Sequence, residues 1–391
     1  MKLRFSEEDE AFRARVRAWL SQNAPEVRRP AEGPGVRAYD LSWQRKLYDG
    51  GWAGIHWPTE YGGQGLSLLQ QLIWHEEHAL AATPDMLSSR TFVGLNHGGP
   101  TLIINASEEQ KRQHLPRILR GEVVWCQGFS EPGAGSDLAG IRTRGRIEGD
   151  YLIVNGQKIW TSFAQDADYQ ELLVRTDPDA SKHAGLTWII CDMTLPGITV
   201  RPIRLLTGRP DFCEVFYDDV KIPLENVVGG IGRGWTVAMS TLAFERGTAM
   251  TEKQIQLSRT IDRLIVLAKE TCRADGTHPI DDPLLRARLA KVRAKATALR
   301  HMTYLNISRL LSKAQPGPEG SMIKVTLAQL AQEIYRLGMD IMGADGLLYE
   351  NGDDGWVHDY LYSYASSIGG GTNEIQNEII AEKGLGLPRM R

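Results

Sequence analysis

Residues 125–140 read WCQGFSEPGAGSDLAG, and at this stretch the pattern of the chain changes. Before it, apolar residues recur at helical spacing; after it, short β-branched and aromatic runs alternate with turn signals. The glycines let the backbone approach a ligand closely, and Ser130 and Ser136 supply hydroxyl groups. A plain β-turn would show a similar composition, and the GxGxxG fingerprint of a Rossmann fold is absent. Two interpretations therefore stand here, a ligand-binding loop and a simple turn.

Upstream of residue 123 the sequence predicts helices. Ser6 and Asp9 have the spacing of a capping box, ahead of an apolar helix face that carries Phe12, Val16, Trp19 and Leu20. Further helices are expected over 42–49, 67–82 and 108–119, with a loop over the glycine-rich residues 54–66.

Downstream, five runs predict strands, and Asn155-Gly156 has the composition of a hairpin turn. The runs are 123–129, 151–160, 171–176, 186–193 and 214–222. After the glycines near residue 230 the helical spacing returns, and we expect helices over 235–272, 282–313 and 321–342, with a shorter one from Thr372. The order along the chain is therefore helical, β, helical.

A second motif, GQKIWTS at 156–162, is expected to end a strand. Trp160 beside Thr161 and Ser162 is suited to stacking on a flat ring and to hydrogen bonding its edge. Without further context, a tryptophan in the core is the more common role for such a residue.

Size and charge limit the classes of protein. A chain of 391 residues is expected to form two or three domains, and a net charge of −3 does not favour nucleic acid or acidic membranes. The first residues, MKLRFSEEDE, carry charge where a signal peptide needs an apolar run, so we expect none. No apolar run approaches the length of a membrane helix, and the four cysteines have no CxxC spacing. We therefore expect a cytoplasmic protein with reduced thiols. His75-Glu76-Glu77-His78 lacks the HExxH spacing, so we expect a polar helix face there and no metal site.

A third motif, Gly371-Thr372-Asn373-Glu374-Ile375-Gln376, completes an ordered set with the two stretches above. Together the three motifs resemble the acyl-CoA dehydrogenases, and the resemblance extends over essentially the whole chain. It implies an α+β multidomain fold. The implied domains are an N-terminal α-helical domain (1–122), a middle β-barrel domain (123–228) and a C-terminal four-helix bundle (229–391).

The resemblance also implies FAD as cofactor and assigns roles to residues. The implied cofactor contacts are Gln127, Phe129, Ser130, Trp160, Thr161, Ser162, Thr372 and Glu374. The implied substrate contacts are Ser136, Phe244 and Arg246. Phe129 stands where the family has a small aliphatic residue, and we expect it to narrow the pocket. Ser162 replaces the usual threonine and keeps the hydroxyl group.

One departure concerns the catalytic base. Many members place a glutamate directly before the Gly-Thr of the third motif, but this chain has Gly370 there. In a minority resembling isovaleryl- and long-chain dehydrogenases, the base lies on a C-terminal helix before an arginine, and Glu245-Arg246 matches that position. Most Glu-Arg pairs lie on solvated helix faces, but the apolar residues 239–244 favour a buried Glu245. We expect Glu245 to be the base, and the Gly370 amide to bind the thioester oxygen.

The implied reaction is the α,β-dehydrogenation of an acyl-CoA to the 2,3-enoyl-CoA, with electrons passing to electron-transfer flavoprotein. The wording of the motifs resembles actinobacterial enzymes of steroid side-chain or bulky-acyl catabolism. A homotetramer, or a heterotetramer with a related subunit, is the implied assembly. Two other interpretations remain open: a non-catalytic partner subunit of the same fold, and a flavin monooxygenase or oxidase.

Overall fold

The computed structural model describes residues 5–81, 83–244, 250–312, 317–349 and 355–388. The chain forms two compact units that interleave along the sequence. The helical unit contains Met1–Ala24, Ser67–Thr83 and Thr248–Arg391. The sheet unit contains Pro25–Leu66 and Pro84–Gly247. Each compact unit combines early and late parts of the chain, so the two units define no boundary at 122 or at 228. The domain limits expected there stay a prediction.

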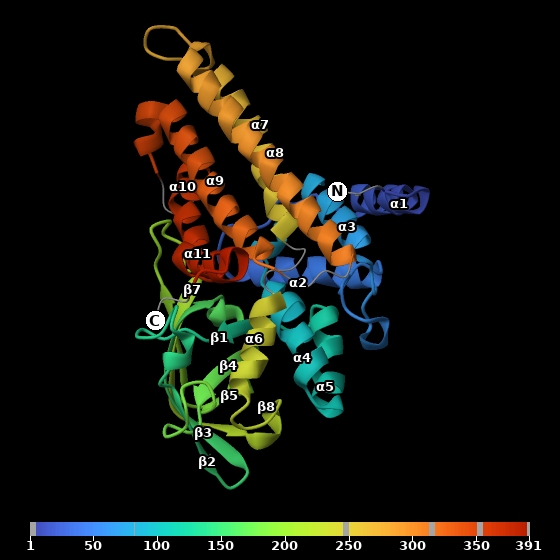
Figure 1. Cartoon of the computed structure of the whole chain (residues 1–391), viewed down its shortest axis with the longest axis vertical. Helices are drawn as coiled ribbons and strands as arrows, with labels where there is room; N and C mark the ends of the chain where they lie inside the picture. The colour runs from blue at the N-terminus through green and yellow to red at the C-terminus, as the bar shows by residue number, and fades with distance from the viewer. Residues whose placement is uncertain (1–4, 82, 245–249, 313–316, 350–354, 389–391) are drawn as a thin grey trace. The chain divides into compact units, whose positions relative to one another are not determined.

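The helical unit is built around three long helices that pack against one another, α7, α8 and α9 (Figure 1). Its helices are α1 (Glu7–Asn23), α3 (Leu68–Leu80), α7 (Met250–Glu270), α8 (Pro283–Leu311), α9 (Glu319–Met342), α10 (Trp356–Ser363) and α11 (Asn373–Ile379). Helices α10 and α11 pack on α9, and leucine, isoleucine and alanine side chains of α7, α8 and α9 form a common core. The expected C-terminal helical domain is therefore confirmed.

Helix α1 forms as its sequence predicts. The Ser6 side chain accepts from the Asp9 amide at 3.1 Å, and the Asp9 carboxylate accepts from the Ser6 amide at 2.8 Å. This capping box satisfies two backbone donors that the helix itself leaves without partners. Phe12, Val16 and Leu20 are buried on one face, and this face packs on α3.

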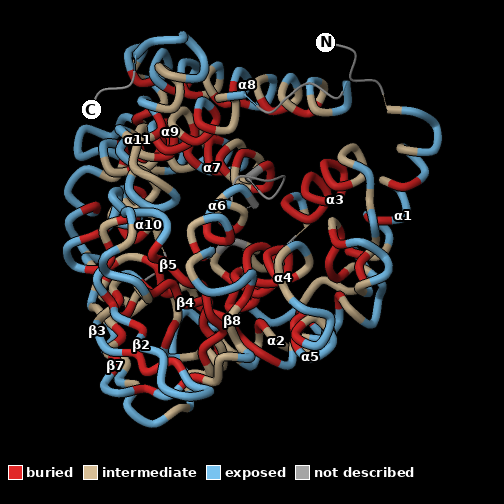
Figure 2. Tube along the Cα trace, turned by 60° about the horizontal axis from the view of Figure 1, so that its bottom comes forward, coloured by how far each residue is buried: buried red, intermediate tan, exposed pale blue. Residues whose placement is uncertain are grey.

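The sheet unit contains a single eight-stranded sheet. Its strands are β1 (Trp125–Gly128), β2 (Arg144–Glu148), β3 (Tyr151–Ser162), β4 (Tyr169–Arg175), β5 (Leu186–Asp192), β6 (Ile198–Ile203), β7 (Phe212–Pro223) and β8 (Val227–Val228). The order is β6-β7-β3-β2-β4-β5-β8, and β1 pairs with β4 in parallel. Figure 2 shows β4 and β5 as largely buried.

Four helices complete this unit, namely α2 (Pro34–Asp49), α4 (Gly99–Asn105), α5 (Glu108–Leu119) and α6 (Gly234–Phe244). Helix α6 packs on β5 and on α4, and α5 packs on α4 and α2. Trp57, Trp125 and Trp188 anchor the apolar core beneath these helices. Most of the expected strands and helices are found, and the order helical, β, helical is confirmed.

One expected turn is wrong. Asn155 and Gly156 lie inside β3, where the pairing with β7 shifts register between Val154 and Gly156. The chain reverses instead at Gly149, whose φ is 56°. Gly156 is needed for another reason: its φ is 146°, and a Cβ there would lie 2.7 Å from the Cα of Thr143. The glycine therefore permits a bulge and a close approach of two backbones.

Other elements depart from expectation in extent. Helix α2 begins at Pro34, eight residues before the expected start, and strands β2, β6 and β8 were not expected. The helix expected over 235–272 is seen as α6 and α7, and residues 245–249 between them lie outside the described part of the chain. None of the described helices is long and apolar enough to cross a membrane. All four cysteines are free thiols, and only Cys272 is exposed.

Candidate active site

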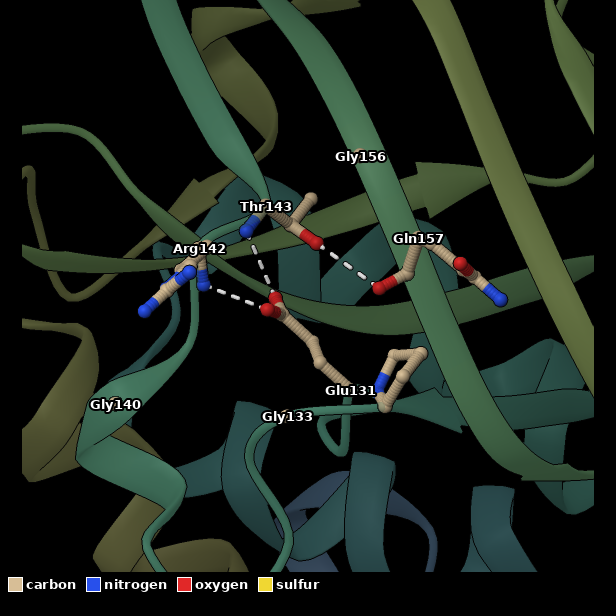
Figure 3. A pocket seen from close by; sticks show the side chains of 8 residues that line it. Glu131, Gly133, Gly140, Arg142, Thr143, Gly156 and Gln157 are labelled. Carbon is tan, nitrogen blue, oxygen red and sulfur yellow. Dashed lines mark hydrogen bonds between the residues drawn. The ribbon is translucent and has the colours of Figure 1, made fainter.

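The glycine-rich loop after β1 is closed on itself by its own acidic residue. The Glu131 carboxylate accepts hydrogen bonds from the amides of Arg142 at 2.6 Å and Thr143 at 2.8 Å (Figure 3). Glu131 and Ala134 also exchange two backbone hydrogen bonds of 3.0 Å. A pocket of about 330 Å³ lies against this loop, with Gly133, Gly140 and Gln157 among its lining residues. The hydrogen bonds of Glu131 therefore fix both ends of this stretch, which is a structured loop and not a simple turn.

The loop residues expected to contact the cofactor differ in exposure. Gln127 is half-buried, and its amide donates to the buried Glu171 carboxylate at 3.1 Å. Ser130 is half-buried, and Ser136 is exposed. Phe129, however, is 4 % exposed and packs in the apolar core of the sheet unit. Its side chain fills the protein core, which is a different role from the expected narrowing of a substrate pocket.

Trp160 is not a core residue, because 55 % of it is exposed. The pairing of β3 with β7 shifts register between Lys158 and Thr161, and Trp160 has a φ of 60°. This irregularity turns the indole out of the sheet, where it meets the edge of the Phe212 ring at a centroid distance of 6.2 Å. An exposed indole in a strained backbone conformation is a feature of ligand sites, and a flat heterocycle fits it.

The two hydroxyl residues after Trp160 lie on opposite sides of the strand. Thr161 is fully buried, and its hydroxyl has no hydrogen-bond partner among the described residues. Ser162 is half-buried at the end of β3. Because the Thr161 hydroxyl faces the interior, Ser162 carries the more accessible hydroxyl group of the pair for the edge of a flat ring.

Lys158 was not expected to be part of the site. It is fully buried, and its ammonium donates to the Phe129 carbonyl at 2.9 Å and to the Glu131 carboxylate at 2.8 Å. Burial lowers the pKa of Lys158 to about 8 despite the neighbouring carboxylate. Burial opposes ionisation of Glu131, but the Lys158 ammonium together with the hydrogen bonds from Thr143 and Arg142 lowers the pKa of that carboxyl group. The alternation of side chains along β3 could have shown that Lys158 is buried, because Leu152, Val154 and Lys158 share the inward face.

The third motif forms a tight turn ahead of α11. Gly370 and Gly371 have φ values of 66° and 86°, which other residues rarely adopt. The side chain of Gln376 is fully buried and donates to the carbonyl oxygens of Gly370 at 3.0 Å and Gly371 at 3.4 Å. Within the described residues, the Gly370 amide donates to no acceptor. The turn therefore holds a backbone donor in place that has no partner in the described part of the protein.

Thr372 and Glu374, the expected cofactor contacts of this motif, lie at the start of α11. The Thr372 hydroxyl caps the helix by accepting from the Ile375 amide at 3.3 Å. Glu374 is exposed, and hydrogen bonds from its own amide and from the Thr372 hydroxyl lower the pKa of its carboxyl group. The carboxylate is therefore ionised and accessible at neutral pH.

The expected base and its neighbours fall at the end of the description. Glu245 and Arg246 lie outside the described residues, and Phe244 is described only as the last residue of α6. Val237, Ala238 and Thr241 are buried on α6, and Ala243 is exposed. The assignment of Glu245 as base stays a prediction.

The histidine and glutamate pairs of α3 are buried, so the expected polar face is wrong. Glu76 and Glu77 share Arg13, with N–O distances of 2.8 Å and 3.0 Å, and Glu76 also accepts from Arg300 at 3.1 Å. His75 and His78 face the Glu252 carboxylate, with N–O distances of 3.7 Å and 3.2 Å. Their partners lie 60 or more residues away, beyond the reach of local patterns. No group suited to a metal ion is found in the described part of the chain.

Comparisons with known proteins agree with this architecture. Three family models match in order: "Acyl-CoA dehydrogenase, N-terminal domain" over 6–122, "middle domain" over 126–220 and "C-terminal domain" over 232–385. Acyl-CoA dehydrogenase IpdE1 of Mycobacterium tuberculosis is 39 % identical, covering 97 % of this chain and 98 % of that protein. Acyl-CoA dehydrogenase FadE26 of the same organism is 35 % identical, covering 100 % and 99 %.

Two solved structures extend the comparison to three dimensions. A structure described as the Tcur3481-Tcur3483 steroid ACAD has a TM-score of 0.86 at 31 % identity and full coverage of both chains. The ChsE4-ChsE5 complex from Mycobacterium tuberculosis has a TM-score of 0.80 at 33 % identity, again with full coverage of both chains. With relatives this similar over nearly its whole length, the chain belongs to the acyl-CoA dehydrogenase family and is an acyl-CoA dehydrogenase in the general sense.

Proposed function

We propose that this chain catalyses the FAD-dependent α,β-dehydrogenation of an acyl-CoA thioester to the 2,3-enoyl-CoA. The observation that carries the proposal is the exposed Trp160 of the sheet unit, which is followed by Ser162 and lies next to Ile159, whose amide donates to the Ser130 carbonyl. An exposed indole near hydroxyl residues suits a flavin ring. In the helical unit, the Gly370 amide donates to no acceptor among the described residues, and such a donor suits the oxygen of a thioester carbonyl.

Each protein group has one part in the reaction. Glu245 takes the proton from the α-carbon of the thioester, and the α C–H electron pair becomes the new C=C bond. Negative charge develops on the thioester oxygen, and the Gly370 amide stabilises it by donating a hydrogen bond. FAD supplies the two-electron acceptor for the hydride that leaves the β-carbon. Trp160 and Ser130 would hold this cofactor, and Phe244 and Arg246 would contact the substrate.

The proposed substrate is an acyl-CoA with a bulky, steroid-derived or branched acyl group. One solved structure that resembles this chain is described as the Tcur3481-Tcur3483 steroid ACAD and another as the ChsE4-ChsE5 complex, and each description names two different chains. We therefore propose a heterotetramer with a related subunit, in the cytoplasm, in which the exposed Ser136 contacts CoA. Electrons would leave through electron-transfer flavoprotein.

Replacement of Glu245 by glutamine tests the proposal. Loss of a positioned general base costs about 10²- to 10⁴-fold in rate, so flavin bleaching by acyl-CoA in an anaerobic stopped-flow instrument should slow by that factor. Glu270→Gln is the matched control, because Glu270 is exposed at the end of α7. Unchanged bleaching in E245Q would refute Glu245 as the base. Purified protein without bound flavin would favour the non-catalytic subunit, and rapid reoxidation in air would favour an oxidase.

A further inference from the structure

Lys158 is a charged side chain with no access to water. It projects from β3 and is 0 % exposed, and its ammonium contacts the Phe129 carbonyl and the Glu131 carboxylate. Burying a lysine and a glutamate costs several kcal/mol per ion, and an apolar pair of the same size is often as stable. Stability alone therefore gives a weak reason for an ion pair at this position. Its geometry gives a stronger one.

The pair ties together both sequence motifs of the cofactor face. Lys158 fixes the main chain at Phe129, which directly precedes Ser130. The Ile159 amide, next to Lys158, donates to the Ser130 carbonyl at 2.9 Å. Trp160 follows Ile159 and leaves the sheet at the register shift. The hydroxyl of Ser130 and the indole of Trp160 thus have a common anchor in the Lys158 ammonium.

The partner carboxylate extends the same anchor to the far end of the loop. Glu131 also accepts the amides of Arg142 and Thr143, so one carboxylate fixes the beginning and the end of the glycine-rich segment (Figure 3). Between these points Gly133 and Gly135 have open space around a Cβ position, and Ala134 between them is buried in the apolar core of the sheet unit. Glu131 therefore holds both ends of the loop, and the Ala134 contact adds to this support.

We propose that Lys158 and Glu131 are positioning residues for the flavin, acting through Ser130 and Trp160, which they hold at a fixed distance from one another. This inference rests on the proposed FAD site at this face. Neither residue needs to touch the flavin, since charge-assisted hydrogen bonds to a loop are strong and directional enough to set its geometry. Loss of the ammonium should free the Phe129 carbonyl oxygen, and the main chain that carries the adjacent Ser130 should then be held less firmly.

The experiment separates positioning from stability by comparing single and double variants of the full chain. Lys158→Met leaves Glu131 buried without its cation, which destabilises the fold. The double variant K158M/E131Q removes both charges, so its urea unfolding midpoint should return close to that of the wild type. Its dissociation constant for FAD should stay raised by about tenfold or more, because the bond to the Phe129 carbonyl is still missing. K158R, which keeps a charged donor, should recover FAD affinity in part.

Lys182→Met is the matched control. Lys182 pairs with Asp137 of the same loop at 2.6 Å, but both side chains are more than half exposed. FAD affinity and the absorbance bands of the bound flavin should be unchanged in this variant, because an exposed pair has little influence on the loop.

The outcomes separate the inference from the proposed function. Wild-type enzyme that is reduced by acyl-CoA, together with a double variant that binds FAD as tightly as wild type, would overturn the positioning role alone. Recovery of stability and FAD affinity together in the double variant would have the same meaning. Wild-type protein that binds no FAD would overturn both.

Discussion

The Gln376 side chain should control the rate of catalysis through a backbone that it holds. In Gln376→Met, a side chain of similar size fills the buried position but donates no hydrogen bond to the carbonyl groups of Gly370 and Gly371. Each lost bond costs about 1 kcal/mol, so the free energy of unfolding should fall by about 2 kcal/mol. The variant should therefore fold, and the effect on the active site can be measured separately.

The rate constant of flavin reduction should also fall, because the Gly370 amide is held less firmly in this variant. Removing one donor from an oxyanion site costs about 10²- to 10³-fold. Gly370 keeps its amide in this variant but loses the bond that fixes its peptide plane, so we expect part of that loss, about 10- to 100-fold. The rate constant of flavin reduction at saturating acyl-CoA, measured anaerobically by stopped flow, reports this step. The KM for substrate should change less.

Gln332→Met provides the control. Gln332 lies in the same helical unit and donates to the Ser367 hydroxyl at 3.2 Å, without contact to the two glycine carbonyls. Its variant should reduce flavin at the wild-type rate. A Q376M enzyme that folds and reduces its flavin within twofold of wild type would show that the Gly370 turn needs no support from Gln376, and the reasoning would be refuted.

Two further predictions concern stability. Burial, with a smaller effect from Arg117, lowers the pKa of His114 to about 4 from 6.5, so the unfolded chain binds the extra proton between these values. The free energy of unfolding should fall by about 3 kcal/mol as the pH drops from 6.5 to 4, and His114→Gln should flatten this part of the urea-derived profile; an unchanged profile would contradict the assignment. Arg29 binds the fully buried Asp40 with two bonds of 2.6 Å and 2.7 Å. Arg29→Met should cost about 3–5 kcal/mol by urea denaturation and R29M/D40N clearly less; equal losses in the two variants would show that the unpaired carboxylate is not the cause.

Local patterns predicted the elements that carry their own signals. The helix cap at Ser6, the helices expected over 67–82 and 108–119, and the buried runs of β4 and β5 are determined by residues close together in sequence. Strands β2 and β6 escaped prediction because they are largely exposed and depend on pairing with β3 and β7. Such strands form because a neighbour supplies hydrogen bonds, and few of their own side chains are buried.

The same distinction applies to the site. The motif order predicted a flavin-facing half, which stays a prediction, and the exposed Trp160 is consistent with it. The contribution of Lys158 could not be weighed, since its partners come from a different motif 27 and 29 residues earlier. The Asn155-Gly156 pair was misleading because glycine is required both in tight turns and in β-bulges, and the sequence alone does not distinguish these two uses. Physical contact between distant segments, and not local propensity, decides these cases.

The buried charges of α3 have a consequence for how the chain is made. Glu76 receives its hydrogen bonds from Arg13 and also from Arg300 and Tyr304 on α8, more than 200 residues later. During synthesis the N-terminal helices of this unit emerge long before those partners exist. Until α8 has been made, the Glu76 carboxylate lacks two of these partners, and water can solvate it in their place. The buried ion network of α3 can therefore be completed only late in synthesis, after Arg300 and Tyr304 have been added.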